Sequence, residues 1–382
     1  MIRILFVDDD VNVLQAMTRA LHCMRNEWSM EFVSSGSAAL QSLAKTPADV
    51  IVSDMRMPGM DGWQLLAEVK NLYPQTVRLV LSGYAEPGAI MRLVGTAHQY
   101  IAKPGERQSL KTAIAQTQLM RRLLSSSETA QRVGNVGTLP SFPKAFQEIS
   151  TCLREPNATV ADAARIITRD VAMTANVMKL VNSAFFGARR QISSVDRAVA
   201  FLGFDTLSAL ALGHGLFQTG SSATEALWQH SLKTAMTAKA IALKQQLPVL
   251  RVEEAFLSGM LHDIGRLVLA VPDDTASGED ATEVTAHHAE AGGYLLGLWA
   301  FPSHIDSAVA QHHTPHLRAD PGLDLTVLVH IADRLVQWQG EGSPTAEELG
   351  IEAGLLESLQ LSDRLPQWVA GAGALNVDRE AS

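Results

Sequence analysis

Four groups of polar residues near the start of the chain each follow a short apolar run that is rich in β-forming residues. Asp8 and Asp9 follow IRILFV, Asp54 follows ADVIVS, Ser82 follows VRLVL, and Lys103 lies in QYIAKP. Such runs predict buried parallel strands, each with a functional side chain at its carboxyl end. Open α/β sheets place their sites at that edge, so we expect these side chains to converge.

Three converging carboxylates repel one another unless a divalent cation lies among them, and ligation by oxygen alone suits Mg²⁺ or Mn²⁺. With the metal bound, one carboxylate can act as the nucleophile toward a phosphoryl group. Ser82 can then hydrogen-bond the transferred group, and Lys103 can neutralise its charge. Taken singly, these residues also fit helix caps, turns and strand ends, but their order along the chain favours phosphoryl transfer.

The second half of the chain holds a series of histidines and aspartates within helical, apolar sequence. Helical spacing places His288 on one face with Gly292 and Leu295, which predicts that it points inward and that the adjacent His287 does not. The same test favours His312 over His313, because His312 shares a face with apolar residues one and two turns earlier. The candidate ligands are His230, His262, Asp263, His288, His312 and Asp333.

Imidazoles and carboxylates that point from several helices into one apolar interior are what a dinuclear metal site requires. Asp263 can bridge two ions, and a bridging water of lowered pKa can attack a phosphodiester. No cysteine accompanies these residues, which favours iron, manganese or zinc bound by oxygen and nitrogen over a structural zinc site. The alternative is a buried network of hydrogen-bonded polar side chains, because burial of so many polar groups is costly unless all are satisfied.

Composition limits the classes of protein to consider. A chain of 382 residues predicts two or three domains, and 47% hydrophobic residues with a net charge of −9 lack the basic footprint of direct nucleic-acid binding. The start MIRILFVDDD predicts a first strand and no signal peptide, and no apolar stretch is long enough for a membrane span. Cys23 and Cys152 show no pairing pattern, so we expect buried thiols in a reducing cytoplasm.

The pattern of the chain changes near residue 121. An amphipathic helix is predicted over 108–124, followed by a segment rich in serine, glycine and proline that indicates a linker at 121–138. Long helical periodicity replaces strand patterns over 139–340. Residues 341–382 predict one or two covering helices and a disordered tail that ends in NVDREAS.

Residues 1–120 resemble the receiver domain of two-component response regulators at all the signature positions of that family. The resemblance implies a doubly wound parallel α/β sheet, a sensor histidine kinase as partner and Mg²⁺ as cofactor. It also implies roles for individual residues: the phosphoacceptor Asp54, the metal ligands Asp8, Asp9, Asp54 and the backbone carbonyl of Arg56, and the switch residues Ser82, Tyr100 and Lys103.

The region from about residue 136 to 340 resembles the HDOD domain, an all-α, HD-related output domain of bacterial signalling proteins. The segments that carry the resemblance include TLPSFPKAFQEI, LVNSAFFGARRQISSVDRAVAFLG and AFLSGMLHDIGRLVL. His230, His262, Asp263, His288, His312 and Asp333 match the HD ligand pattern, with His313 as an additional contact.

Three departures separate this region from catalytic HD relatives. It lacks the Gly-Tyr-Pro motif of cyclic-di-GMP hydrolases, Arg266 stands where a lysine is usual, and Ala226 stands where trinuclear members carry an acid. Many HDOD domains are interaction modules without catalysis. The resemblance therefore implies a response regulator in which Asp54 phosphorylation controls an HDOD module that binds a downstream signalling protein, as a monomer or a homodimer. The alternative is a metal-dependent phosphohydrolase under receiver control.

Overall fold

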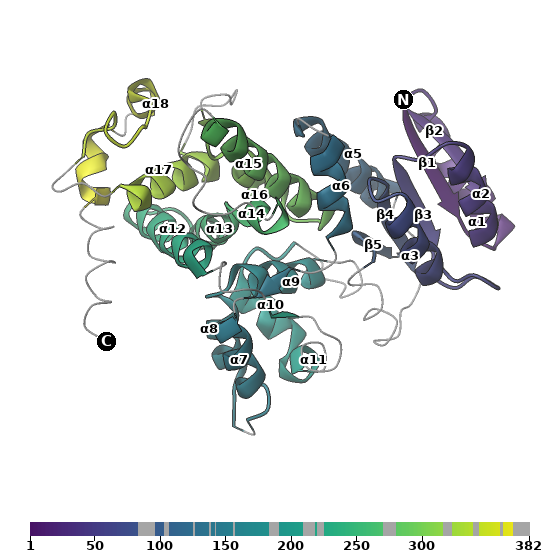
Figure 1. Cartoon of the computed structure of the whole chain (residues 1–382), viewed down its shortest axis with the longest axis horizontal. Coiled ribbons are helices and arrows are strands. Elements are labelled where there is room, and N and C mark those ends of the chain that lie inside the picture. The colour runs from purple at the N-terminus through teal and green to yellow at the C-terminus, as the bar shows by residue number, and fades with distance from the viewer. Residues whose placement is uncertain are drawn as a thin grey trace.

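The structure is a computed structural model of the whole chain. It describes residues 1–82, 96–102, 107–124, 127–136, 139–141, 143–155, 157–182, 191–208, 218–219, 225–269, 280–315, 323–338, 344–359 and 362–369. The chain forms an α/β domain at the N-terminus and a predominantly helical domain after it (Figure 1). This arrangement confirms the predicted fold class. Within the described residues, no helix combines the length and the apolar character needed to cross a membrane.

The α/β domain is built on one parallel sheet of five strands in the order β2-β1-β3-β4-β5. Helices connect the strands, as crossovers between parallel strands require. The elements, in chain order, are β1 (Ile2–Val7), α1 (Val11–Ala20), η1 (His22–Met24), β2 (Trp28–Val33), α2 (Gly36–Lys45), β3 (Val50–Asp54), α3 (Gly62–Leu72), β4 (Val77–Ser82), β5 (Gln99–Ala102) and α5 (Arg107–Leu123).

Alternation along the strands produces two separate apolar layers. Leu5 and Val7 face the layer that α2 and α3 cover, whereas Ile4 and Phe6 face the layer that contains Ile114 of α5. Successive side chains of a strand point to opposite faces, so a strand with helices on both sides must be apolar at every position. Full burial of each such side chain contributes about 1.5–3 kcal/mol, which explains the continuous apolar runs in the sequence.

The helical domain follows a short helix, α6 (Ser127–Asn135), that lies within the segment expected to be a linker. A two-residue parallel pair, β6 (Pro140–Ser141) with β7 (Gln218–Thr219), adds a small sheet to the predicted all-helical architecture. The helices are α7 (Pro143–Cys152), α8 (Val160–Ile167), α9 (Val171–Val181), α10 (Val195–Leu202), α11 (Phe204–Ser208), α12 (Glu225–Lys244), α13 (Val249–Leu261), α14 (Ile264–Leu269), α15 (Asp280–Leu298), α16 (Ser303–Gln311), α17 (Leu325–Gln337), α18 (Ala353–Ser358) and η7 (Ser362–Arg364).

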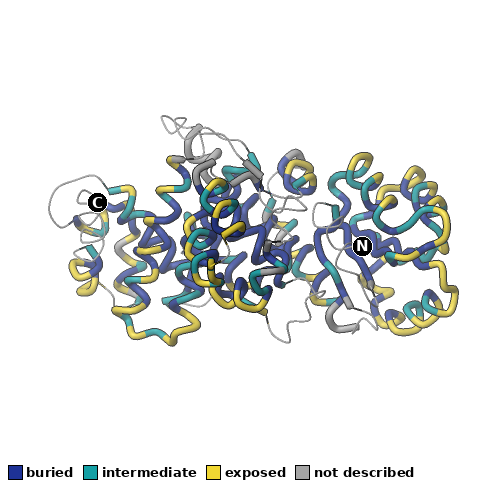
Figure 2. The backbone as a smooth tube through the Cα atoms, turned by 90° about the horizontal axis from the view of Figure 1, so that it is seen from below, coloured by how far each residue is buried: buried dark blue, intermediate teal, exposed yellow. Residues whose placement is uncertain are grey.

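Helices α5 and α6 lie between the sheet and the helical domain, where both pack against α15 (Figure 1). One apolar core runs from the sheet through these helices into the helical domain. Figure 2 shows buried stretches in the interior of both domains. Arg78 at the start of β4 is fully buried, and its Nη2 donates to the carbonyl oxygen of Gly134 in α6 at 2.6 Å. The segment between the domains is thus clamped to the sheet.

Two glutamines of the α/β domain hold the helical domain directly. Gln99 in β5 donates from Nε2 to the carbonyl oxygen of Gly297 in α15 at 2.9 Å. Gln116 in α5 donates from Nε2 to the carbonyl oxygen of Phe301 and to Oδ2 of Asp306 in α16, each at 2.7 Å. The β5–α5 side of the sheet therefore contacts the ends of two consecutive helices of the other domain.

The C-terminal region expected to form covering helices contains α18 and η7, and Leu356 and Trp368 join the apolar core there. The tail expected at the very end of the chain lies outside the described residues, which stop at residue 369.

Candidate functional site

The first candidate site lies at the carboxyl edge of the sheet. Val7 of β1 pairs with Ser53 of β3, so Asp8 and Asp54 follow at the same level on neighbouring strands. Asp8 is 3% exposed and Asp54 9% exposed, whereas Asp9 is exposed. The two buried carboxylates are oriented by the backbone, because Asp54 Oδ2 accepts from the N–H of Arg56 at 2.8 Å and Asp8 Oδ1 accepts from that of Asp10 at 3.1 Å.

The loop after the acceptor strand returns tightly to it. The N–H of Gly62 donates to the carbonyl oxygen of Met55 at 3.0 Å, and a Cβ at residue 62 would overlap the carbonyl oxygen of Asp54. Asp61 caps α3 reciprocally with Gln64, which fixes the start of the helix at this point. Glycine is therefore required at residue 62 to bring α3 against the acceptor strand.

The remaining residues of the predicted phosphoryl site are placed only in part. Ser82 ends β4 opposite Ala102 of β5, at the same edge as Asp54, but its side chain lies outside the described residues, as does all of Lys103. The Tyr100 hydroxyl is buried and has no hydrogen-bond partner among the described residues. Burial raises the pKa of Tyr100 well above its ordinary value, so the phenol is neutral.

The second candidate site is a cluster of histidines and aspartates from six segments of the helical domain. His230 lies on α12, His262 ends α13, Asp263 precedes α14, His288 lies on α15, and Asp333 lies on α17. His312 is the C-cap residue that follows α16, and His313 comes directly after it. Their ligand atoms form two groups, each within 4.8 Å: Asp263 with His288, His312 and His313, and His230 with His262 and Asp333. Among the described residues, the aspartates of the sheet edge do not form such a group.

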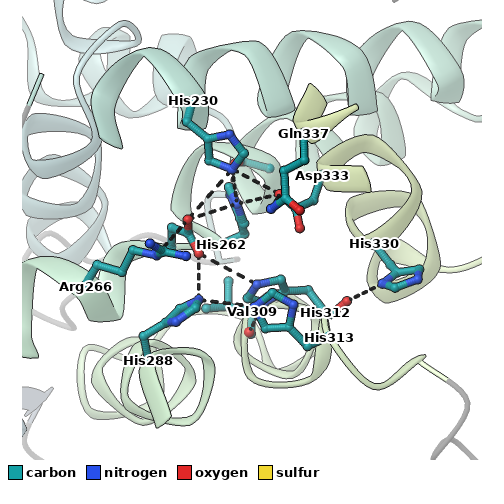
Figure 3. Close-up of polar contacts among 12 residues, drawn as sticks. His230, His262, Arg266, His288, Val309, His312, His313, His330, Asp333 and Gln337 are labelled. Carbon is teal, nitrogen blue, oxygen red and sulfur yellow. Dashed lines mark hydrogen bonds and ion pairs between the residues drawn. The ribbon is translucent and has the colours of Figure 1, made fainter. Parts of the chain in front are cut away.

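Asp263 joins the two groups, because its two carboxylate oxygens lie near histidines of different groups. Figure 3 shows these histidines turned toward one centre. Asp263 Oδ1 lies 2.7 Å from His288 Nε2 and 3.8 Å from His312 Nε2, and its Oδ2 lies 3.5 Å from His262 Nε2. His313 completes the first group, with its Nε2 3.3 Å from that of His288. In the second group, His230 Nε2 lies 3.0 Å from Asp333 Oδ1 and 3.2 Å from His262 Nε2.

Backbone carbonyls determine which ring nitrogen of two histidines faces the centre. Nδ1 of His262 lies 2.8 Å from the carbonyl oxygen of Gly259, and Nδ1 of His312 lies 2.7 Å from that of Val309. A carbonyl oxygen only accepts, so both Nδ1 atoms carry hydrogen, and in the neutral rings both Nε2 atoms present lone pairs inward. Nε2 of His312 has no hydrogen-bond partner among the described residues. Nitrogen lone pairs that face carboxylate oxygens fit a cation, since alone they repel.

Burial and charge act in opposite directions within the cluster. Burial opposes the ionisation of Asp263, but the charges of His262 and His288 outweigh it and hold the pKa of Asp263 well below its ordinary value. Burial also opposes protonation of His262, yet Asp263 and Asp333 raise its pKa to about 9. For His313, burial and the neighbouring His288 lower the pKa to about 3. The cluster therefore holds ionised carboxylates beside both a proton-retaining and a neutral imidazole.

Comparison with known families assigns both domains. A family model of the response regulator receiver domain matches residues 4–115, and a model of the HDOD domain matches residues 139–315. The chain is a response regulator with a receiver domain and an HDOD domain.

Individual relatives resemble parts of the chain. An uncharacterized protein of Treponema pallidum is 26% identical over 203 residues, 47% of this chain and 39% of that protein. The hydrogenase transcriptional regulatory protein HoxA of Cupriavidus necator is 39% identical over 103 residues, 26% of this chain and 21% of that protein. The crystal structure of the MmoQ response regulator from Methylococcus capsulatus is 26% identical, with 58% of this chain and 98% of that chain covered at a TM-score of 0.45. The chain thus spans less than two fifths of either curated relative.

The HDOD cluster includes every residue that the HD pattern indicated, and one histidine that the helix-face test disfavoured. His288 is buried while His287 is half-buried, as that test predicts. Between His312 and His313 the test is incomplete, because both offer ligand atoms to the first group. Helix α16 ends at Gln311, and its C-cap residue His312 still has helical backbone angles, whereas His313 lies past the cap, where helical periodicity no longer applies.

Sequence reasoning missed two residues that support the ligands. Gln337 donates from Nε2 to Asp333 Oδ1 at 2.9 Å, and Nδ1 of His330 lies 2.7 Å from the carbonyl oxygen of His312. Both lie on α17 within one turn of Asp333, so helical spacing around that aspartate is the signal that points to them. Such outer contacts orient the ligands of metal sites.

The residues of the HDOD cluster fit a transition metal. The donors are imidazole nitrogens and carboxylate oxygens, and the buried Nε2 of His312 lacks a hydrogen-bond partner among the described residues. Four such donors in the first group equal the usual coordination number of zinc, and the same donor set suits manganese or iron.

Proposed function

We propose that this protein is a cytoplasmic two-component response regulator in which phosphorylation of Asp54 by a sensor histidine kinase controls the HDOD domain as a signalling interaction module. In this proposal Asp8, Asp9, Asp54 and the carbonyl oxygen of Arg56 hold Mg²⁺ for the transfer. Ser82 and Lys103 bind the phosphoryl group, and Tyr100 carries the change to the β5–α5 side. The HDOD domain then binds a downstream signalling protein.

The observation that carries the proposal is the contact of β5 and α5 with α15 and α16. Gln99 is adjacent to Tyr100 in β5 and holds Gly297 of α15, while Gln116 of α5 holds Asp306 of α16. His288 precedes Gly297 by nine residues, about 14 Å along the same helix. A movement of β5 or α5 on phosphorylation would thus act on the two helices that present His288 and His312, and rigid packed helices transmit such shifts.

Phosphorylation with acetyl phosphate and Mg²⁺ tests the proposal directly. The wild type should incorporate phosphate and change its amide hydrogen exchange in α5 and α15, whereas Asp54→Asn should do neither. Asp10→Asn is the matched control, because asparagine also caps a helix N-terminus and should leave labelling intact. Equal labelling of the wild type and Asp54→Asn, or labelling of the wild type with unchanged exchange at the junction, would refute the proposal.

A second candidate function is metal-dependent phosphoester hydrolysis, which the convergent donors of the HDOD cluster favour. A bound metal would polarise a phosphoryl oxygen and lower the pKa of a bound water. Asp263, His288 and His312 would hold the ion, and Arg266 would stand beside the reacting anion as a fixed positive charge. The Gly-Tyr-Pro motif is absent, so we expect no hydrolysis of cyclic dinucleotides. Protein loaded with Mn²⁺ should release p-nitrophenol from bis(p-nitrophenyl) phosphate if this activity exists. If the protein retains the metal but does not hydrolyse this substrate, the interaction module remains the proposed function of the HDOD domain.

A further inference from the structure

We propose that Arg266 limits the HDOD cluster to one metal ion, held by Asp263, His288, His312 and His313. The inference rests on the proposed metal binding and concerns the number and the place of the ions. It differs from the dinuclear arrangement that the sequence suggests, in which Asp263 bridges two ions.

The two carboxylate oxygens of Asp263 have different surroundings. Oδ1 faces the first group, with His288 Nε2 at 2.7 Å and His312 Nε2 at 3.8 Å. Oδ2 lies 3.1 Å from Nε of Arg266, closer than its distances of 3.5 Å to His262 and 3.8 Å to His230. The guanidinium therefore stands at the oxygen through which Asp263 would bridge to a second ion. Figure 3 shows Arg266 pointing into the cluster between His230 and His288.

Charge also opposes a second ion. Asp263 and Asp333 are the only acids in the two groups of described ligand residues, and both are almost completely buried. Two dications together with the guanidinium would leave a large positive excess in this interior, and burial of uncompensated charge is costly. One dication with the guanidinium leaves a much smaller excess. An arginine keeps its charge at all accessible pH values, so this contribution is permanent.

The two groups also differ in how far their atoms satisfy one another. In the second group, Asp333 Oδ1 accepts from Gln337 at 2.9 Å and lies 3.0 Å from His230 Nε2, so the group forms a polar network of its own. In the first group, His312 Nε2 and His313 Nδ1 have no hydrogen-bond partner among the described residues, and His312 Nε2 lies 3.8 Å from Asp263 Oδ1. The second group leaves one carboxylate oxygen without a partner, Asp333 Oδ2, whereas both unpartnered imidazole nitrogens of the cluster's described residues lie in the first group, and the single ion is assigned there.

Metal content measures the inference without any assay of activity. The full chain is loaded with Mn²⁺, freed of excess metal and analysed by mass spectrometry, with electron paramagnetic resonance to separate isolated from coupled ions. The wild type should retain about one ion per chain, uncoupled, and Arg266→Ala should retain about two with the coupled spectrum of a two-metal site. Arg154→Ala, which removes an exposed arginine elsewhere in the domain, should match the wild type.

Two further variants place the ion. His313→Gln should weaken Mn²⁺ binding by the wild type about 10-fold or more, whereas His230→Gln should change it by less than about 3-fold. The inference would be overturned, with metal binding itself intact, by two ions in the wild type or by one ion in Arg266→Ala. It would also be overturned if His230→Gln weakened Mn²⁺ binding more than His313→Gln. Absence of retained metal from the wild type and from Arg266→Ala would remove metal binding itself.

Discussion

Asp306 is a buried carboxyl group at the contact between the receiver and HDOD domains, and Asp306→Asn should remove a defined part of the pH dependence of stability. Asp306 is 0% exposed, and its Oδ2 accepts a hydrogen bond from Gln116 Nε2 at 2.7 Å. Burial raises the pKa of Asp306 to about 7, although hydrogen bonds from Gln116 and Ser307 oppose the shift. Asparagine has nearly the same shape, keeps an acceptor for Gln116, and does not titrate.

The sign of the effect follows from proton binding. Between the ordinary pKa of 3.8 and the raised value of about 7, the folded protein holds a proton on Asp306 that the unfolded chain has released. The stabilisation that this proton contributes to the folded state is therefore complete below the ordinary pKa. It is lost as the pH rises through the raised pKa of the folded protein. The difference between the two pKa values corresponds to about 4 kcal/mol of folding free energy over the whole pH range between them. Between about pH 5.5 and about pH 8 it corresponds to about 2 kcal/mol.

Urea denaturation at these two pH values measures the effect, because the other titrating groups contribute equally to the wild type and the variant. When the pH is raised from about 5.5 to about 8, the free energy of unfolding of the wild type should fall by about 2 kcal/mol more than that of Asp306→Asn. Asp363→Asn, at an exposed residue of η7, is the control and should follow the wild type. Parallel losses in the wild type and Asp306→Asn would show that Asp306 titrates normally and would refute the reasoning.

Two other substitutions test the packing that places the sites. Arg78→Met should lower the free energy of unfolding by about 2–4 kcal/mol, since the carbonyl oxygens of Thr96 and Gly134 each lose a charged donor. Urea denaturation measures this, and a loss below about 1 kcal/mol would contradict it. Gly265→Ala should cost more than about 3 kcal/mol in thermal unfolding, because its Cβ would overlap the carbonyl oxygen of His288 and lie 2.8 Å from Gly292 N. Gly354→Ala is the matched control, with no atom within 4 Å of its added Cβ; similar midpoints for the two variants would show that α14 and α15 separate easily.

Local pattern was sufficient to predict the elements and several orientations. Apolar runs that end in Asp8 and Asp54 predicted parallel strands, and parallel strands gather their carboxyl ends at one edge of a sheet by geometry alone. Helical period likewise predicted that His288 faces inward. These inferences depend on the backbone geometry of a single element, which is the same in every protein.

Only the tertiary structure decided how the elements meet. His313 joins the cluster although it lies beyond the end of α16, and Arg266 approaches the Oδ2 oxygen of Asp263 rather than Oδ1. Gln116 reaches Asp306 across 190 residues of chain. Such contacts depend on crossing angles and distances between elements that are remote in sequence, and these are set by the packing of the whole core, which no local periodicity records.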